Sequence, residues 1–168
     1  MKIFILIKKF SDSMIKLSAY IGALALAIMS IAITYEVIFR YFFNSPTIWS
    51  SEVSRYCSVY ILFMGLSYTL REKAHINIEI VTKYIPTKPR IFIKILTDCI
   101  GMALALLIII EGWKMFYEAY DLSLKSMEVI RTPLAIPYFC IPWGGFWLAV
   151  QYMIQLSSNF QSLIRGET

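Results

Sequence analysis

The chain has 168 residues, of which 58% are hydrophobic and only 16% are charged. A soluble domain is about a quarter charged, so this composition argues against a soluble globular protein. The apolar residues fall in long blocks, which is typical of helices that cross a bilayer. The formal net charge is +5, but the basic residues lie between the apolar blocks, which favours a role in membrane orientation over nucleic-acid binding.

The first apolar block is the uncharged run Leu17–Tyr35, which follows a basic, amphipathic stretch. Its nineteen residues would form about 28 Å of helix, close to the ~30 Å thickness of the hydrocarbon core. The run is long for the apolar region of a signal peptide, and no convincing cleavage site follows it. We therefore predict an uncleaved first transmembrane helix over residues 17–39.

The second and third blocks predict transmembrane helices over residues 49–70 and 91–117. The third block contains Asp98 and Glu111, which would lie about 20 Å apart along a helix. They cannot both lie outside a core about 30 Å thick, so at least one must enter the membrane. We expect Asp98 at the membrane edge near Lys94, and a direct role for either acid stays open.

The fourth block, Thr132–Ile164, has no charged residue over thirty-three positions. It predicts a fourth transmembrane helix over residues 133–157. Pro142 and the pair Gly144-Gly145 lie within it and predict a kink or a weakened backbone hydrogen-bond ladder.

The connection Arg71–Arg90 between the second and third helices predicts a short helix lying along the membrane surface. The predicted fold is therefore an all-α integral membrane protein with four transmembrane helices and this interfacial helix. The elements form one membrane domain over residues 1–168.

The distribution of Lys and Arg predicts the orientation of the helices in the membrane. If the N-terminus lies in the cytoplasm, eleven of the sixteen basic residues fall on cytoplasmic segments and five on outer ones. Cytoplasmic segments of membrane proteins carry an excess of Lys and Arg. All four tryptophans then fall toward the outer half, as in an aromatic belt. Both signals favour an N-in, C-in topology.

Two pairs of charged residues lie near the predicted outer helix ends. Glu36 precedes Arg40 by four positions and Glu52 precedes Arg55 by three, so each pair shares one helix face. We interpret these pairs as structural, within the chain or toward a partner, and a direct transport role is the alternative. An ion-coupling site would need a carboxylate near the midplane beside broken helices, and the sequence has no clear pair of that kind.

Other chemistries are disfavoured by the residues available. The single histidine, His75, cannot supply the two axial ligands that a membrane haem b usually needs. The cysteines Cys57, Cys99 and Cys140 lack metal-ligand spacing and are interpreted as small apolar residues. No zinc-ligand cluster, GxSxG, Walker A or GxGxxG motif occurs. We therefore expect no catalytic site, no cofactor and no bound metal.

Residues 40–80 carry an ordered set of motifs. They are an Arg-Tyr pair, an Asn-x-Pro-x-x-Trp turn, a Glu shortly after the Trp, a Gly in the next helix, an Arg at its end, and a His before alternating aliphatic residues. The residues are Arg40, Tyr41, Asn44, Pro46, Trp49, Glu52, Gly65, Arg71 and His75. This set resembles the small transmembrane subunit of tripartite ATP-independent periplasmic (TRAP) transporters. Two minor departures are Glu79 in place of a frequent Asp and the run Tyr68–Leu70 where Ala is common.

The resemblance implies a scaffold subunit in the bacterial inner membrane. It implies a large multi-span partner that imports carboxylated solutes with a sodium gradient, and a periplasmic protein that delivers the solute. The motif residues, together with Arg55, are then structural or assembly candidates. In particular, we predict that the segment from Arg40 to Glu52 is an assembly element, with Arg40 or Arg55 pairing with Glu52.

Two other functional classes compete with this one. A stand-alone four-helix carrier acting as a homodimer is the alternative, and it would need an essential membrane-embedded carboxylate. A small membrane enzyme would need a cluster of catalytic or metal-binding residues, which the sequence lacks. The sequence does not identify the solute, the copy number or the partner-facing helix.

Overall fold

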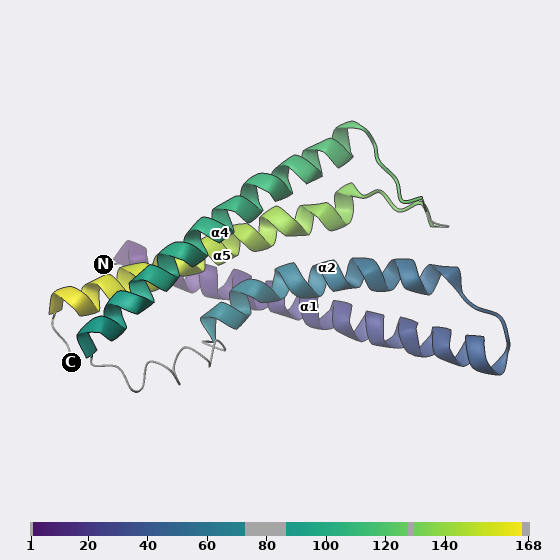
Figure 1. Cartoon of the computed structure of the whole chain (residues 1–168), viewed down its shortest axis with the longest axis horizontal. Coiled ribbons are helices and arrows are strands. Elements are labelled where there is room, and N and C mark those ends of the chain that lie inside the picture. The colour runs from purple at the N-terminus through teal and green to yellow at the C-terminus, as the bar shows by residue number, and fades with distance from the viewer. Residues whose placement is uncertain (1, 73–86, 128–129, 166–168) are drawn as a thin grey trace.

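The structure is a computed structural model, which describes residues 2–72, 87–127 and 130–165 (Figure 1). Side chains are described within residues 9–72, 93–127 and 130–160. This part of the chain contains four α-helices: α1 (Lys2–Phe42), α2 (Ile48–Arg71), α4 (Thr87–Asp121) and α5 (Ala135–Arg165). The predicted all-α fold is confirmed for these residues. The predicted surface helix and His75 lie within residues 73–86, outside the described residues.

The helices form two antiparallel hairpins, α1–α2 and α4–α5 (Figure 1). One end of the bundle, here the loop end, holds the α1–α2 link (43–47) and the α4–α5 loop (122–134). The opposite end, here the terminal end, holds the start of α1 and the end of α5. The hairpins meet through α2 and α5, so the helices lie in the order α1, α2, α5, α4. The flanking helices α1 and α4 therefore each leave a side that no described helix covers.

Two of the four helices are long and apolar enough to cross a membrane, over Lys9–Phe42 and Ile93–Asp121. They are the flanking helices α1 and α4. The inner helices are more polar: α2 contains five serines and Glu52, and α5 contains Gln151, Gln155 and Asn159. Polar residues suit helices that are covered by other helices, because their groups find partners there. The four-span topology stays a prediction.

Glycines on α5 bring this inner helix close to α2 and α4. A Cβ added at Gly144 would lie 2.3 Å from the carbonyl oxygen of Phe63 on α2. A Cβ added at Gly145 would lie 2.9 Å from a methyl carbon of Ile108 on α4. Small residues at such positions allow close backbone approach between helices in lipid. The Gly144-Gly145 pair, predicted to weaken the helix, therefore has a packing function.

Pro142 lies inside α5, which is continuous from Ala135 to Arg165. Proline has no amide hydrogen, so it cannot donate to the carbonyl group four residues earlier. The missing hydrogen bond lies in the part of α5 just before Gly144 and Gly145.

Polar contacts tie α5 to all three other helices. Trp143 Nε1 donates to Ser18 Oγ on α1 at 3.4 Å, and Gln155 Nε2 donates to the Leu70 carbonyl oxygen on α2 at 3.2 Å. Asn159 Nδ2 donates to Asp98 Oδ2 on α4 at 2.6 Å. Interhelical hydrogen bonds of this kind stabilise helix association in bilayers.

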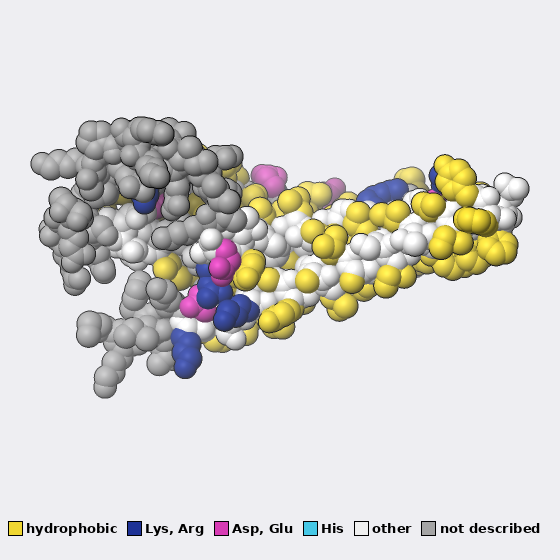
Figure 2. Space-filling view, turned by 90° about the horizontal axis from the view of Figure 1, so that it is seen from below, with side chains coloured by type: hydrophobic (Ala, Val, Ile, Leu, Met, Phe, Trp, Pro, Cys, Tyr) yellow, Lys and Arg dark blue, Asp and Glu magenta, His cyan; other side chains and the backbone are white. Residues whose placement is uncertain are grey.

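Few large apolar side chains are buried in the described part of the chain. The main buried cluster is Leu70, Ala105, Leu148 and Ala149. Most of the leucine, isoleucine and aromatic side chains of α1 and α4 are exposed, and Figure 2 shows apolar side chains along the length of the bundle. A soluble monomer rarely exposes so continuous an apolar surface, so this surface suits lipid or a protein partner.

Candidate functional site

The first polar cluster joins α1 to α2 near the loop end. Glu36 pairs with Arg40 one turn later on α1, as the spacing of the two residues predicted. The buried hydroxyl of Ser50 on α2 donates to Glu36 Oε2 at 2.8 Å and lies 3.0 Å from the carbonyl oxygen of Ala32. Glu36 is therefore held by a cation on its own helix and by a hydroxyl on the next one.

The α1–α2 link forms the tight turn predicted from Asn44 and Pro46. Asn44 has a φ of 48°, a left-handed conformation that asparagine adopts more readily than most residues and that often ends a helix. The amide of Ser45 donates to the carbonyl oxygen of Phe39 at 3.2 Å. Trp49 follows in the first turn of α2, and its ring centroid lies 5.5 Å from that of Tyr35 on α1. Pro46 is exposed.

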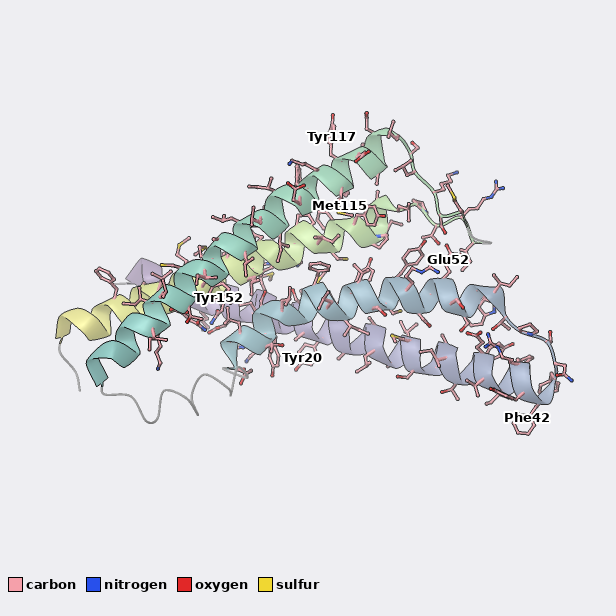
Figure 3. The ribbon with its side chains drawn as sticks, viewed as in Figure 1. Tyr20, Phe42, Glu52, Met115, Tyr117 and Tyr152 are labelled. Atoms are coloured by element: carbon pink, nitrogen blue, oxygen red, sulfur yellow. The ribbon has the colours of Figure 1, made fainter. Side chains whose placement is uncertain are left out.

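The second polar cluster surrounds Glu52, on the first turns of α2 and fully buried (0% exposed). Its Oε2 accepts from the backbone amide of Ile130 at 3.2 Å, and its Oε1 accepts from the Tyr56 hydroxyl at 3.1 Å. The hydroxyl groups of Ser126 and Thr132 also hydrogen-bond with this carboxylate. Three of these four partners belong to the α4–α5 loop, which lies beside Glu52 in Figure 3.

The α4–α5 loop has a hairpin-like backbone that presents these donors together. The amide of Ser126 donates to the Thr132 carbonyl oxygen and that of Leu134 to the Leu124 carbonyl oxygen, each at 3.0 Å. An isolated antiparallel bridge joins Lys125 and Pro133. A carboxylate that accepts several hydrogen bonds is a strong anchor for such a loop, because charge-assisted bonds are stronger than neutral ones. Glu52 thus fastens the α4–α5 loop to α2.

The predicted partners of Glu52 need a correction at Arg40. The structure pairs Arg40 with Glu36 rather than with Glu52. The physical reason is local: four positions along one helix bring Arg40 onto Glu36, whereas the α4–α5 loop supplies amide and hydroxyl donors to Glu52. Arg55 is exposed on α2.

The remaining motif residues are dispersed over both ends of the bundle. Tyr41 is 76% exposed in the last turn of α1. Gly65 lies in α2, and an added Cβ would meet no described atom within 4 Å. Arg71, at the end of α2, pairs with Asp12 of α1 through its Nε at 2.9 Å. Among the described residues, the motif therefore includes residues of both ends and does not form one pocket.

The two acids of α4 lie in contrasting environments. Asp98 is 7% exposed and accepts a hydrogen bond from Asn159 of α5. Glu111 pairs with Lys114 one turn later, at 2.7 Å, and the side chains of both residues are more than 60% exposed, at 63% and 65%. Asp98 was expected beside Lys94, whose positive charge does act on this carboxylate, and its hydrogen bond comes from the neighbouring helix. Its place at the membrane edge stays a prediction.

The chemistry of these clusters is that of structural anchors. Within the described residues, no group of three or more His, Cys, Asp or Glu side chains could hold a metal ion. Glu36, Glu52 and Asp98 each accept hydrogen bonds from a neighbouring helix or loop. The expected absence of a cofactor and of a catalytic site stays a prediction.

Sequence reasoning missed the contact between Glu52 and the α4–α5 loop. The two are separated by 78 positions, so no local spacing rule joins them. The available signal was the composition of the loop, where Ser126 and Thr132 lie close to basic residues. Hydroxyl groups in a loop at a helix end often bind backbone or side-chain acceptors nearby.

Similarity to a known family extends over most of the chain. The family described as tripartite ATP-independent periplasmic transporters, DctQ component, matches residues 29–162. This range includes α2, α4, most of α5 and both polar clusters.

Individual relatives agree with the family match. The chain is 28% identical over 143 residues to one putative TRAP transporter small permease protein of Haemophilus influenzae, covering 84% of this chain and 86% of that protein. It is 31% identical over 145 residues to a second such protein of that organism, covering 82% and 86%. It is also 32% identical over 98 residues to the sialic acid TRAP transporter permease protein SiaT of Haemophilus influenzae, covering 58% of this chain but only 16% of that protein.

Proposed function

The chain belongs to the DctQ family of TRAP transporter small permease subunits, and we propose that it is the scaffold subunit of a secondary transporter in the bacterial inner membrane. In this proposal it binds a large multi-span subunit, which moves the solute. A periplasmic solute-binding protein delivers the solute to the outer face. The observation that carries the proposal is the family match over residues 29–162.

Two features of the chain support a scaffold role. The acids Glu36, Glu52 and Asp98 are each engaged by donors of the same chain, which suits fixed structure better than ion release. The flanking helices α1 and α4 leave long apolar sides, which a larger membrane complex would cover.

The solute and the driving ion are part of the proposal as well. The relative SiaT is named for sialic acid, a carboxylated solute, and we propose that this system also imports an organic acid. We propose coupling to a sodium gradient, with the sodium sites on the large subunit. The chain would then be a transport protein that catalyses no reaction of its own.

The proposed topology has four spans with both termini in the cytoplasm. The excess of Lys and Arg on the segments next to the terminal end supports this orientation. The loop end would then face the periplasm, and the Glu52-anchored loop would lie on the outer surface.

Co-purification tests the proposed function directly. The chain would be tagged and expressed with a multi-span TRAP permease from the same genome, and we expect the two to purify as one complex. Deletion of this chain should abolish solute uptake by the permease. Normal uptake without the chain would refute the scaffold role.

The alternative is a stand-alone homodimeric carrier. It predicts that the chain purifies as a dimer and supports uptake without any other membrane protein. The family match favours the small-subunit role, because the relatives of similar length are named as small permease proteins.

A further inference from the structure

The outward side of α4 carries charged residues within an otherwise apolar span. Ile93–Asp121 is long and apolar enough to cross a membrane, yet it includes Glu111, Lys114 and Glu118. Together with Leu104 and Leu107, these residues are three or four positions apart and form one exposed face. We call these five residues the α4 stripe.

The depth of Glu111 follows from the length of the uncharged run before it. Twelve uncharged residues separate Asp98 from Glu111, which correspond to about 18 Å of helix. The hydrocarbon core is about 30 Å thick. With Asp98 near one edge of the core, Glu111 lies well before the other edge, where a lipid-exposed carboxylate is costly.

Three other acids near apolar segments in the described part of the chain are turned inward, whereas Glu118, on the same stripe as Glu111, is exposed. Glu52 and Asp98 are buried, and the Glu36 side chain is only 15% exposed. Glu111 differs from them, because its side chain is 63% exposed and the partner that the structure gives it, Lys114, is 65% exposed. If lipid covered this surface, we would expect Glu111 to be turned inward, as those three acids are.

The other flanking helix provides the comparison. The run Leu17–Tyr35 of α1 contains no charged residue, and its exposed side chains include Leu24 (62%) and Ile31 (70%). This uncharged part of α1 is suited to lipid. Among the described residues, the ion pair of α1, Glu36–Arg40, lies near the end of the helix and its Glu36 side chain is only 15% exposed, whereas both side chains of the Glu111–Lys114 pair on α4 are exposed.

We infer that the α4 stripe is the surface that docks the multi-span permease subunit. This inference rests on the proposed function. A protein partner can supply polar groups to Glu111 and Lys114, which lipid chains cannot, and such contacts are favourable between helices in a bilayer. The match to SiaT supports a permease as the occupant, because the segment that resembles this chain is 16% of that longer permease protein.

Site-specific photocrosslinking tests the assignment. A benzophenone amino acid would replace Leu107, which is 56% exposed on the α4 stripe, or Leu24, which is 62% exposed on α1. The tagged chain would be irradiated in membranes that contain the permease. We expect an adduct of chain plus permease from position 107 and none from position 24.

Each other outcome has a defined meaning. An adduct from position 24 alone, equal adducts from both positions, or an adduct between two copies of the chain from position 107 would overturn the inference. So would the absence of any protein adduct from position 107 while the unmodified chain still co-purifies with the permease. If the unmodified chain does not co-purify with the permease, the proposed function itself fails.

A second measurement uses the charges. The double variant Glu111→Leu/Lys114→Leu should reduce permease recovery at least threefold, while the chain remains in the membrane at a normal level. If lipid covers the α4 stripe, the apolar variant should leave permease recovery unchanged. Leu24→Gln on α1 is the control for the effect of an altered flank, and it should not reduce permease recovery.

Discussion

At the scale of single residues, the polar side chains of this protein join one element to another. Ser50 joins α2 to Glu36 of α1, and Asn159 joins α5 to Asp98 of α4. Glu52 joins α2 to a loop 78 positions away, through the amide of Ile130. Removing one partner of a buried hydrogen bond leaves the other unsatisfied, which is the costly part of such a substitution.

Glu52→Gln should loosen the α4–α5 loop. The glutamine has a similar shape, but it replaces one acceptor oxygen with a donor that faces the hydrogen-bond donors of the loop. We expect faster hydrogen exchange of the backbone amides of residues 122–134, together with reduced recovery of the permease complex. Glu72→Gln, at an exposed acid at the opposite end of α2, is the matched control and should leave exchange in the loop unchanged. Equal exchange in both variants would exclude Glu52 as the anchor of the loop.

Arg40→Ala should disturb a different contact from Glu52→Gln. It removes the cation beside Glu36 and leaves the Glu52 cluster intact. We expect lower recovery of the assembled transporter from Arg40→Ala, with the solute concentration for half-maximal uptake barely changed in the complexes that form. A large shift in that concentration would indicate a role in solute binding and contradict the assembly interpretation.

Asn159→Leu should weaken the contact between α4 and α5. Interhelical hydrogen bonds in membrane proteins contribute about 0.6 kcal/mol on average and up to about 2 kcal/mol. We therefore expect a loss of stability in this range, measured by unfolding in mixed detergent micelles. Phe160→Leu, at an exposed neighbouring position, should have a smaller effect. If Asn159→Leu left the stability of the protein unchanged, the bond to Asp98 would contribute nothing to it.

The residue scale also shows which contacts the sequence could predict. The pair of Glu36 and Arg40 follows from helical spacing and is confirmed. The turn at Asn44 follows from the residue types and is confirmed by its positive φ. The loop donors to Glu52 and the Asn159 donor to Asp98 come from distant segments. Such contacts depend on how the helices pack, which local patterns do not contain.

At the scale of elements, the inner helix α5 depends on residues without side chains. Gly144 faces the backbone of α2 and Gly145 faces side chains of α4, so one dipeptide serves two interfaces. The sequence predicted four helices in this order, because apolar blocks and charged borders are local features, but α1 begins at Lys2, well before the predicted start at residue 17, and α5 continues to Arg165. The glycine pair was interpreted as a weak point in a helix, because the neighbours that require close approach are not visible in the sequence.

Gly144→Ala should destabilise the bundle. Its Cβ would lie 2.3 Å from the Phe63 carbonyl oxygen, so α5 and α2 would have to move apart. Overpacking of this kind typically costs about 1–3 kcal/mol. Gly65→Ala is the control on α2, where an added Cβ meets nothing within 4 Å and alanine improves helix propensity. A Gly144→Ala protein with the unfolding temperature of the Gly65→Ala protein would contradict the proposed close contact.

At the scale of the whole molecule, the arrangement places different chemistry on its two ends and two flanks. The anchor Glu52 and the exposed aromatic residues Tyr41 and Phe42 lie toward the loop end. Figure 2 shows charged side chains near the terminal end of the face that it displays. The α1 flank is uncharged over nineteen residues, whereas the α4 flank carries the ion pair Glu111–Lys114. A complex with a larger membrane protein on one flank and lipid on the other is consistent with this asymmetry.

The proposed orientation, with the loop end facing the periplasm, gives the final prediction. In a background without the three native cysteines, Met127→Cys should react with an impermeant thiol reagent in intact cells, since Met127 is fully exposed at the loop end. Thr87→Cys and Gly166→Cys should react only after the cells are permeabilised, because eleven of sixteen basic residues favour a cytoplasmic location for those segments. Labelling of Thr87→Cys in intact cells would rule out the four-span topology, and protection of Met127→Cys with labelling of Gly166→Cys would show the opposite orientation.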